Sequence, residues 1–272
     1  MIKLVGLKNI KYELDSLKEI PHILFTGPRG SGKTTLSKYL AETKKKKLIF
    51  TTGNTLKKNE LLNIFINLEE GDILLIDEIH RLLPAIEEML YQPMEDFVLP
   101  IKDYTGQHQL IKLPKFSVIG TTTKPSKISK PLMSRFKLVL QISHYSVREL
   151  ARIVKQNFGI PNHDALRIAI NVVTPREAIN LAYRVLQLDR SNITKALEFI
   201  GYKHGLSQLE RYYMKILQNA GKLSLSSLCS ALQLDQDEVS YIEDKLLRKG
   251  LIEITNRGRS LTVKGMMKVK NF

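Results

Sequence analysis

The chain has 272 residues, 43% of them hydrophobic and 25% charged, which is enough for two or three globular domains. It contains no apolar run of bilayer-spanning length, and its N-terminus lacks the apolar core of a signal peptide. A single cysteine excludes an internal disulfide and a cysteine-based zinc site. The formal net charge of +15 predicts a polyanionic partner, and nucleic acid is favoured over a membrane surface. We therefore expect a cytoplasmic protein.

The stretch 27–34 reads GPRGSGKT and fits the phosphate-binding pattern G-x-x-x-x-G-K-[ST]. A strand-like apolar run at 23–25 precedes it, and helical spacing follows it, so backbone N–H groups and a helix N-terminus can surround a polyphosphate. We expect Lys33 to reach the β- and γ-phosphates and Thr34 to bind Mg²⁺. The alternative is a glycine-rich turn that only caps a helix. The predicted triphosphate-binding residues are Gly27, Gly30, Ser31, Gly32, Lys33, Thr34 and Thr35.

The stretch 72–78 reads DILLIDE, an apolar run typical of a central parallel strand that ends in two carboxylates. Parallel sheets bind ligands at the carboxyl ends of their strands. We therefore predict that Asp77 binds Mg²⁺ and that Glu78 polarises the attacking water. The alternative is that both carboxylates only cap a helix.

The segment around this run alternates between strands and helices. Strands are predicted at 48–51, 116–120 and 138–142, and a hairpin is predicted within 97–113 with its turn at 104–107. This pattern predicts an α/β unit with about five strands.

The second half of the chain changes to helical spacing. Residues 147–204 are predicted to form a small helical lid in which Thr174 caps a helix, Pro175 occupies its first turn, and Arg176 follows.

The last segment predicts three helices followed by a two-stranded hairpin, which is the order of a winged helix. The helices are expected at 207–219, 224–232 and 236–249, and the strands at 251–254 and 261–263. Five basic residues and no acidic residue follow from Arg257 onward, so DNA contact is favoured over a merely solubilising tail.

Four stretches resemble the RuvB family, the bacterial AAA+ motors that drive Holliday-junction branch migration. These are DILLIDEIHRLLPAIEEMLYQPMEDF, FSVIGTTTKP, PLMSRF and NRGRSLTVKG. The resemblance covers nearly the whole chain. It implies an α/β P-loop AAA+ core with a parallel sheet (1–145), an all-helical lid (146–204) and a C-terminal winged helix (205–272).

The resemblance also implies roles for individual residues. ATP and Mg²⁺ are the implied cofactors, with Thr34 and Asp77 as metal ligands and Leu4 and Val5 beside the adenine. Thr122 resembles the polar sensor of the γ-phosphate. The implied catalytic residues are Lys33, Asp77, Glu78, Thr122, the trans-acting arginine finger Arg135 and the lid sensor Arg176.

The partners that the resemblance implies are double-stranded DNA or a Holliday junction, further copies of the chain in a hexameric ring, and a RuvA-like protein. Arg257 and Arg259 resemble the wing residues that touch DNA, and the hairpin near 98–112 resembles the one that docks onto RuvA. The sequence departs from the family in its shorter N-terminus and hairpin. Met133 also replaces an arginine and Val173 a glycine.

Two other functions share parts of this pattern. A clamp-loader or origin-initiator ATPase has the same core and lid, but it usually carries other residues after the acidic pair. A DNA-binding regulator with a vestigial ATPase core is disfavoured because the lysine, both carboxylates, the polar sensor and two arginines are all retained.

Overall fold

The computed structural model describes residues 4–102 and 107–272, and the chain divides into two compact units, Met1–His144 and Tyr145–Phe272. Among the described residues, no helix combines the length and apolar character needed to cross a membrane.

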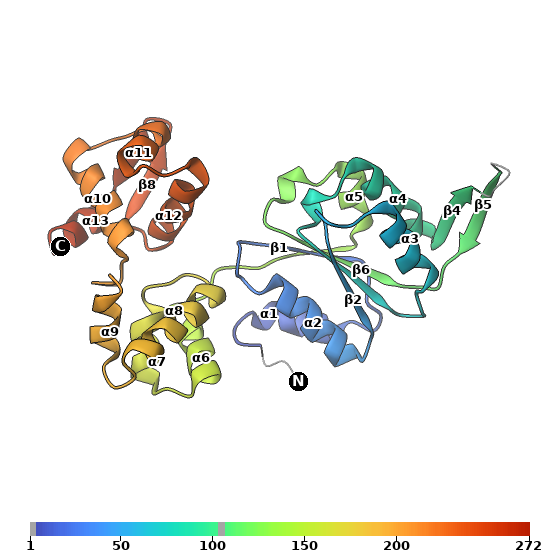
Figure 1. Ribbon diagram of the computed structural model, residues 1–272, viewed down its shortest axis with the longest axis horizontal. Helices are drawn as coiled ribbons and strands as arrows, with labels where there is room; N and C mark the ends of the chain where they lie inside the picture. Colours follow the sequence, from blue (N-terminus) through green and yellow to red (C-terminus); the bar gives the residue numbers. More distant parts are fainter. Residues whose placement is uncertain (1–3, 103–106) are drawn as a thin grey trace. The chain divides into compact units, whose positions relative to one another are not determined.

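The first unit is built on a five-stranded parallel sheet in the order β2-β3-β6-β1-β7 (Figure 1). Every residue of β1 and β6 is buried, as are the first four residues of β3, so helices must cover both faces of the sheet. The prediction of an alternating α/β unit with about five strands is therefore confirmed. The strands are β1 Ile23–Thr26, β2 Leu48–Thr52, β3 Ile73–Asp77, β6 Ser117–Thr122 and β7 Leu138–Gln141.

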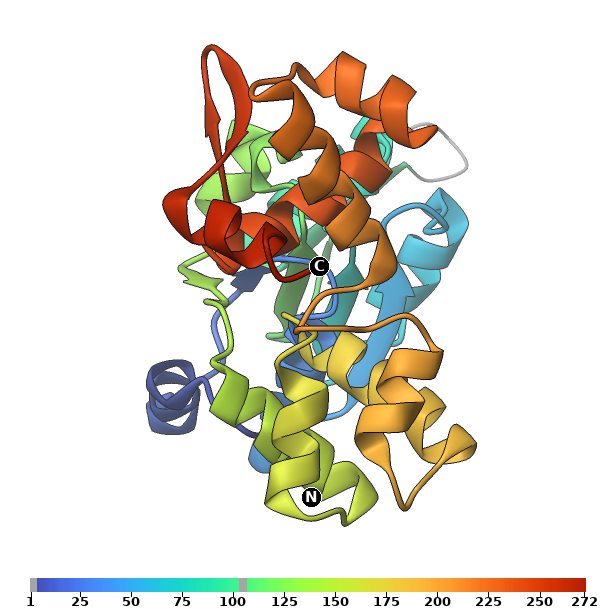
Figure 2. The same ribbon diagram turned by 90° about the vertical axis from the view of Figure 1, so that its left-hand side faces the viewer.

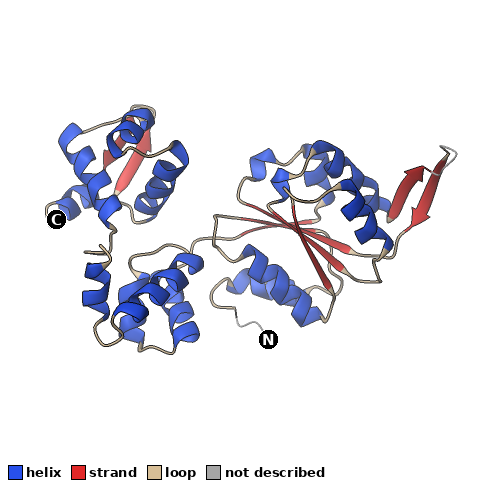
Figure 3. Cartoon of the chain, viewed as in Figure 1, coloured by secondary structure: helices blue, strands red, loops and turns tan. Residues whose placement is uncertain are grey.

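Helices pack on the two faces of this sheet (Figures 1 and 3). On one face lie α1 (Lys8–Ser16) and α2 (Lys33–Lys44). On the other lie α3 (Lys58–Ile66), α4 (Pro84–Asp96) and α5 (Lys130–Arg135), which share one apolar core with β3 and β6. Two short 3₁₀ turns, η1 (Ile79–Arg81) and η2 (Pro125–Lys127), follow β3 and β6.

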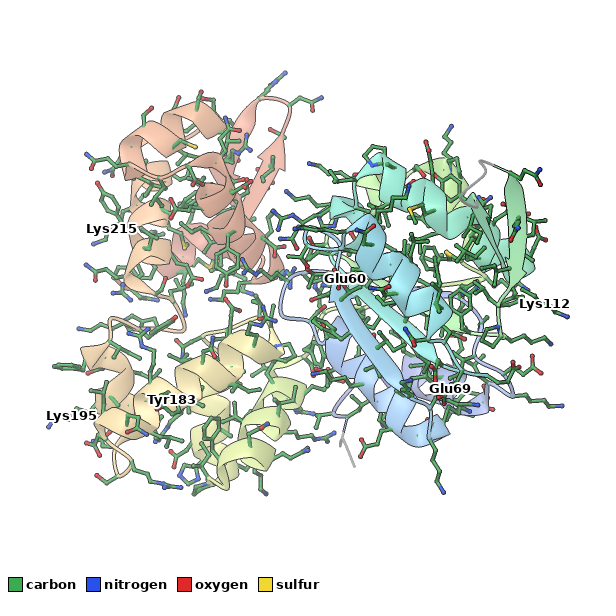
Figure 4. The ribbon with its side chains drawn as sticks, turned by 45° about the vertical axis from the view of Figure 1, so that its right-hand side comes forward. Glu60, Glu69, Lys112, Tyr183, Lys195 and Lys215 are labelled. Carbon is green, nitrogen blue, oxygen red and sulfur yellow. The ribbon has the colours of Figure 1, made fainter. Side chains whose placement is uncertain are left out.

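A separate antiparallel hairpin extends from the first unit (Figure 1). Its strands are β4 (Val98–Lys102) and β5 (His108–Lys112), paired from Val98 opposite Lys112. The predicted hairpin is therefore present, but residues 104–106 of its predicted turn lie outside the described residues. Lys112 lies at the surface near the base of the hairpin (Figure 4).

The second unit consists of a helical part and a winged helix (Figure 2). The helical part contains α6 Val147–Phe158, α7 Asn162–Ala169, α8 Pro175–Leu188 and α9 Ile193–Phe199. The winged helix contains α10 Gln208–Ala220, α11 Leu225–Leu232, α12 Gln236–Arg248, β8 Ile252–Thr255, β9 Gly258–Leu261 and α13 Val263–Val269. Both parts were predicted, but the domain boundary near 204 stays a prediction.

The end of the chain differs from the predicted strand at 261–263. Strand β9 ends at Leu261, and α13 begins at Val263. The reason is a helix cap: the Thr262 hydroxyl accepts a hydrogen bond from the backbone N–H of Gly265 at 3.0 Å. The β-branched residues of this stretch suit a strand by composition, but the cap turns the backbone into a helix.

A cluster of buried and partly buried polar side chains, which we call the junction cluster (Glu177, Glu210, Tyr241, Lys245 and Lys249), joins α8 to α10 and α12. The Lys245 ammonium lies 3.2 Å from both Glu177 and Glu210, and the Lys249 ammonium lies 3.2 Å from Glu210. The Tyr241 hydroxyl donates to Glu177. Burial by itself lowers the pKa of Lys245, but the two carboxylates raise it well above its usual range. The cations and carboxylates of this cluster therefore compensate one another.

Candidate functional site

The phosphate loop (residues 27–34) lies between β1 and α2, as the sequence predicts. Gly27, Gly30 and Gly32 all have positive φ angles, of 148°, 78° and 95°. A Cβ on Gly27 would also lie only 3.1 Å from the Cβ of Ile142. The loop therefore needs glycine for both its backbone conformation and its close packing, which lets consecutive N–H groups face a ligand.

Lys33 is buried at the start of α2, with 6% of its surface exposed. Its ammonium donates to the carbonyl oxygens of Gly27 and Pro28, both at 2.9 Å. These loop carbonyls hold the charge in place against the cost of burial. The lysine is thus positioned at the loop, where a phosphate would offer it a fully charged partner.

Thr34 and Asp77 meet at the carboxyl end of β3. The Thr34 hydroxyl donates to Asp77 Oδ1 at 3.4 Å, and the Thr121 hydroxyl donates to the same oxygen. These are hard oxygen donors, which suit Mg²⁺. No group of three or more histidine, cysteine, aspartate or glutamate side chains that could hold a metal occurs among the described residues.

Glu78 follows immediately in a left-handed backbone conformation, with φ 51° and ψ 47°. Its carboxylate is about one-third exposed, and Oε2 accepts a hydrogen bond from the Thr123 hydroxyl at 3.3 Å. The turn packs against Gly53, where an added Cβ would lie 2.5 Å from the Glu78 carbonyl oxygen. Any side chain at position 53 would therefore collide with the turn at Glu78.

Three consecutive threonines, the last two residues of β6 and the residue after it, contact different groups. Thr122, the predicted sensor, is fully buried, and its hydroxyl lies 2.9 Å from His80 Nδ1. Its neighbours Thr121 and Thr123, which the sequence analysis missed, contact the carboxylates of Asp77 and Glu78. The run TTT predicts hydroxyl groups at the end of a strand. Which hydroxyl contacts which carboxylate depends on the register of β6 beside β3, which the sequence does not give.

Arg135 lies at the end of α5 and extends onto α4. Its Nη2 donates to Glu95 at 2.9 Å, its Nε donates to the Tyr91 carbonyl at 3.0 Å, and its guanidinium lies 4.3 Å from the centre of the Tyr91 ring. Arg135 therefore pairs with a carboxylate of its own chain. Its role as an arginine finger stays a prediction.

The other residues predicted to contact the nucleotide are Leu4, Val5 and Arg176. Leu4 and Val5 are half-buried in the extended segment before α1. Arg176 belongs to the second unit, where it is exposed in the first turn of α8. Thr174 caps that helix and Pro175 lies in its first turn, as the sequence predicts, and Glu177 completes a reciprocal capping box with Thr174. The assignments of Leu4, Val5 and Arg176 to the nucleotide stay predictions.

The two wing arginines differ in their surroundings. Arg257 is exposed in the turn between β8 and β9. Arg259 instead donates to Glu243, with Nε 2.9 Å from Oε1, and the Tyr213 hydroxyl donates to the same oxygen at 2.9 Å. Glu243 is 3% exposed, so Arg259 compensates a buried charge within the winged helix. Arg257 is therefore the more exposed of the two, and the DNA-binding role of both arginines stays a prediction.

The fold and the site together define a class of protein. The parallel sheet has the phosphate loop after β1, the acidic pair at the end of β3, and polar residues at the end of β6, which lies between these two strands. This is the arrangement of AAA+ ATPases. Here a helical part and a winged helix follow it. Family models agree: "Holliday junction DNA helicase RuvB P-loop domain" matches residues 9–142, and "RuvB C-terminal winged helix domain" matches residues 203–270.

Individual relatives identify the family. The chain is 41% identical to the Holliday junction branch migration complex subunit RuvB of Nitratiruptor, over 94% of this chain and 84% of that protein. The corresponding Thermotoga maritima protein is 32% identical, and its solved structure, described as a Holliday junction branch migration motor, superposes with a TM-score of 0.79 over 98% of this chain and 95% of that chain. The chain belongs to the RuvB family.

Proposed function

We propose that the protein is an ATP-driven motor that moves duplex DNA and thereby migrates Holliday junctions in recombination and repair. One observation carries this proposal: the acidic pair of β3 lies against the phosphate loop, with Thr34 Oγ1 3.4 Å from Asp77 and Glu78 next in the chain. A vestigial ATPase would have no need to keep this arrangement. In a member of the RuvB family, it supports use of ATP hydrolysis for branch migration.

The residues of the site divide the work of ATP hydrolysis. Lys33 and the loop N–H groups bind the phosphates, and Leu4 and Val5 lie beside the adenine. Thr34 and Asp77 would hold Mg²⁺, which neutralises phosphate charge when bound. Glu78 orients the attacking water and accepts its proton on a carboxylate oxygen. Thr123 takes the sensor role more readily than Thr122, because its hydroxyl reaches the Glu78 carboxylate.

Assembly completes the site in this proposal. Arg135 leaves its contacts with Glu95 and Tyr91 and enters the nucleotide site of the neighbouring subunit in a hexameric ring, where it stabilises the charge that develops on the phosphate. Arg176, in the first turn of α8, contacts the nucleotide of its own subunit and reports its state. Mixing two inactive proteins, Lys33→Ala and Arg135→Ala, tests this: a trans-acting finger restores part of the hydrolysis in mixed rings, and a cis-acting arginine restores none.

DNA and the partner protein use other surfaces. The exposed Arg257 on the wing contacts the duplex backbone, and the net charge of +15 strengthens this binding at low salt. The β4–β5 hairpin carries two exposed apolar side chains, Leu110 (65% exposed) and Ile111 (38% exposed), which a RuvA-like protein would cover. A cytoplasmic location is part of the same proposal.

The deciding experiment measures ATP hydrolysis with single strands, linear duplex and a four-way junction, together with movement of the junction. DNA-stimulated hydrolysis that moves the junction, with or without a RuvA-like partner, supports the motor. Hydrolysis without junction movement in either case indicates a loader or initiator. A lack of hydrolysis with every DNA would indicate a regulator.

A further inference from the structure

His80 belongs to the string DEIHRL, and the roles proposed so far leave it unused. It lies in η1, the 3₁₀ turn that follows β3, and its side chain is only 8% exposed. A histidine in such a turn could be a packing residue only. Its polar contacts argue for more than packing.

One ring nitrogen of His80 lies between two groups of the ATPase site. Nδ1 is 2.9 Å from Thr122 Oγ1 and 3.2 Å from Glu78 Oε2. Thr122 Oγ1 also accepts from the Lys124 N–H at 3.0 Å, and Glu78 Oε2 also accepts from the Thr123 hydroxyl at 3.3 Å. His80 therefore connects the end of β6 to the carboxylate that activates water.

The chemistry of these groups determines where the imidazole proton lies. An ionised carboxylate only accepts hydrogen bonds, so a bare Nδ1 facing Glu78 at 3.2 Å would bring two acceptors together. Nδ1 therefore carries the proton: it donates a hydrogen bond to Thr122 Oγ1 at 2.9 Å, and the same N–H lies beside the Glu78 carboxylate, whose Oε2 is 3.2 Å from Nδ1 and is attracted by it. Burial lowers the pKa of His80 even though Glu78 opposes the shift, so the ring is neutral with its one proton on Nδ1.

We propose that His80 is a positioning residue for hydrolysis: its Nδ1–H, supported by Thr122, fixes the orientation of the Glu78 carboxylate. This rests on the proposed ATPase function. It gives Thr122 a role different from a direct γ-phosphate sensor, because its hydroxyl acts through the imidazole. The orientation of Glu78 then depends on His80, which follows β3, and on Thr122 and Thr123 at the end of β6.

The test compares two amides at position 80. In His80→Asn the amide nitrogen can take the place of Nδ1, whereas in His80→Gln it reaches the place of Nε2 instead. We expect His80→Gln to lower kcat by about 100-fold with an unchanged Kd for ATP, since a small misplacement of a catalytic group has an effect of that order. His80→Asn should recover much of kcat. A packing role would be indicated if both amides behaved alike, and equal kcat for His80→Gln and the wild type would overturn the proposal.

Two controls separate this inference from the proposed function. Glu78→Gln, assayed alongside, must lose hydrolysis, and the wild type must have it; failure of either condition counts against the ATPase assignment itself. The Thr122→Val change is then combined with His80→Gln. If the two residues act through one contact, the double variant loses little more than His80→Gln alone, and fully multiplicative losses would contradict the link.

Discussion

The nucleotide site of the first unit and the junction cluster of the second unit both gather charged side chains, but they compensate them differently. At the nucleotide site, Lys33 is held by backbone carbonyls, and Asp77 is held by hydroxyls. In the junction cluster, Lys245 lies 3.2 Å from two carboxylates. Carbonyls and hydroxyls can yield to a charged phosphate or a metal ion, whereas paired ions have already neutralised each other. A charged residue held by neutral groups therefore indicates a binding site, whereas a charged residue paired with an opposite charge indicates a structural one.

The largest expected effect is at the nucleotide site. Glu78→Gln keeps the size of the side chain but cannot accept a proton, so kcat should fall by about 10³-fold. ATP binding and the free energy of unfolding should change little, because the carboxylate is about one-third exposed and its hydrogen bond from Thr123 can be kept by the amide oxygen. Single-turnover hydrolysis and ATP titration measure the two parts. If the variant instead lost stability, Glu78 would be a structural charge rather than a catalytic one.

The reverse result is expected in the junction cluster. Lys245→Met leaves Glu177 and Glu210 buried without this cation, so the second unit should lose about 3–4 kcal/mol of unfolding free energy. Urea unfolding of the full chain measures this. The matched control is Arg167→Met, which removes an exposed pair with Asp164 and should change stability by less than about 1 kcal/mol. Equal effects of the two substitutions would remove the distinction between the regions.

The two wing arginines differ in the same way: Arg257 is available for binding, whereas Arg259 compensates a buried charge. Arg259→Gln leaves Glu243 with a weaker partner and should cost about 1–3 kcal/mol of stability. Arg257→Gln should leave stability unchanged but weaken duplex binding and lower the salt dependence by about one ion. Thermal unfolding and DNA titrations at several salt concentrations test both. The assignment is reversed if Arg259→Gln affects only DNA binding.

The smallest effect concerns a buried histidine in the core of the first unit. His22 accepts from the Val118 N–H through Nδ1, and its Nε2 lies 2.8 Å from the Met94 carbonyl; burial lowers its pKa below 6.5. The unfolded chain then binds the proton more readily, so stability is complete above pH 6.5 and falls as the pH drops below it. The slope cannot exceed about 1.4 kcal/mol per pH unit, since one proton is linked. Unfolding of His22→Gln should lack this part of the slope, and an identical pH profile would contradict it.

The sequence predicts best what is encoded locally. The phosphate loop, the strand that ends in Asp77 and the helix cap at Thr174 each occupy a few consecutive residues, and the structure has all three. Helix α4 was not among the predicted elements. It contains Pro93, and proline disfavours a helix interior. Here α4 persists because Leu90 and Met94 pack into the core of the first unit. Tertiary packing overrides the local signal.

The partners of the site residues were harder to predict because they are distant in the sequence. Glu243 lies 16 residues from Arg259, and Glu95 lies 40 residues from Arg135. No spacing rule connects such pairs; only the packing of α12 against the wing and of α4 against α5 does so. The same limit applies to His80 and Thr122, which are 42 residues apart.

The left-handed backbone at Glu78 has a consequence for how this protein could evolve. A residue with a side chain at φ 51° is strained by about 1 kcal/mol or more, and glycine avoids that strain. Glu78→Gly would therefore gain back part of the folding free energy while removing the group that activates water. The fold therefore keeps a strained residue at the position where the reaction needs a carboxylate.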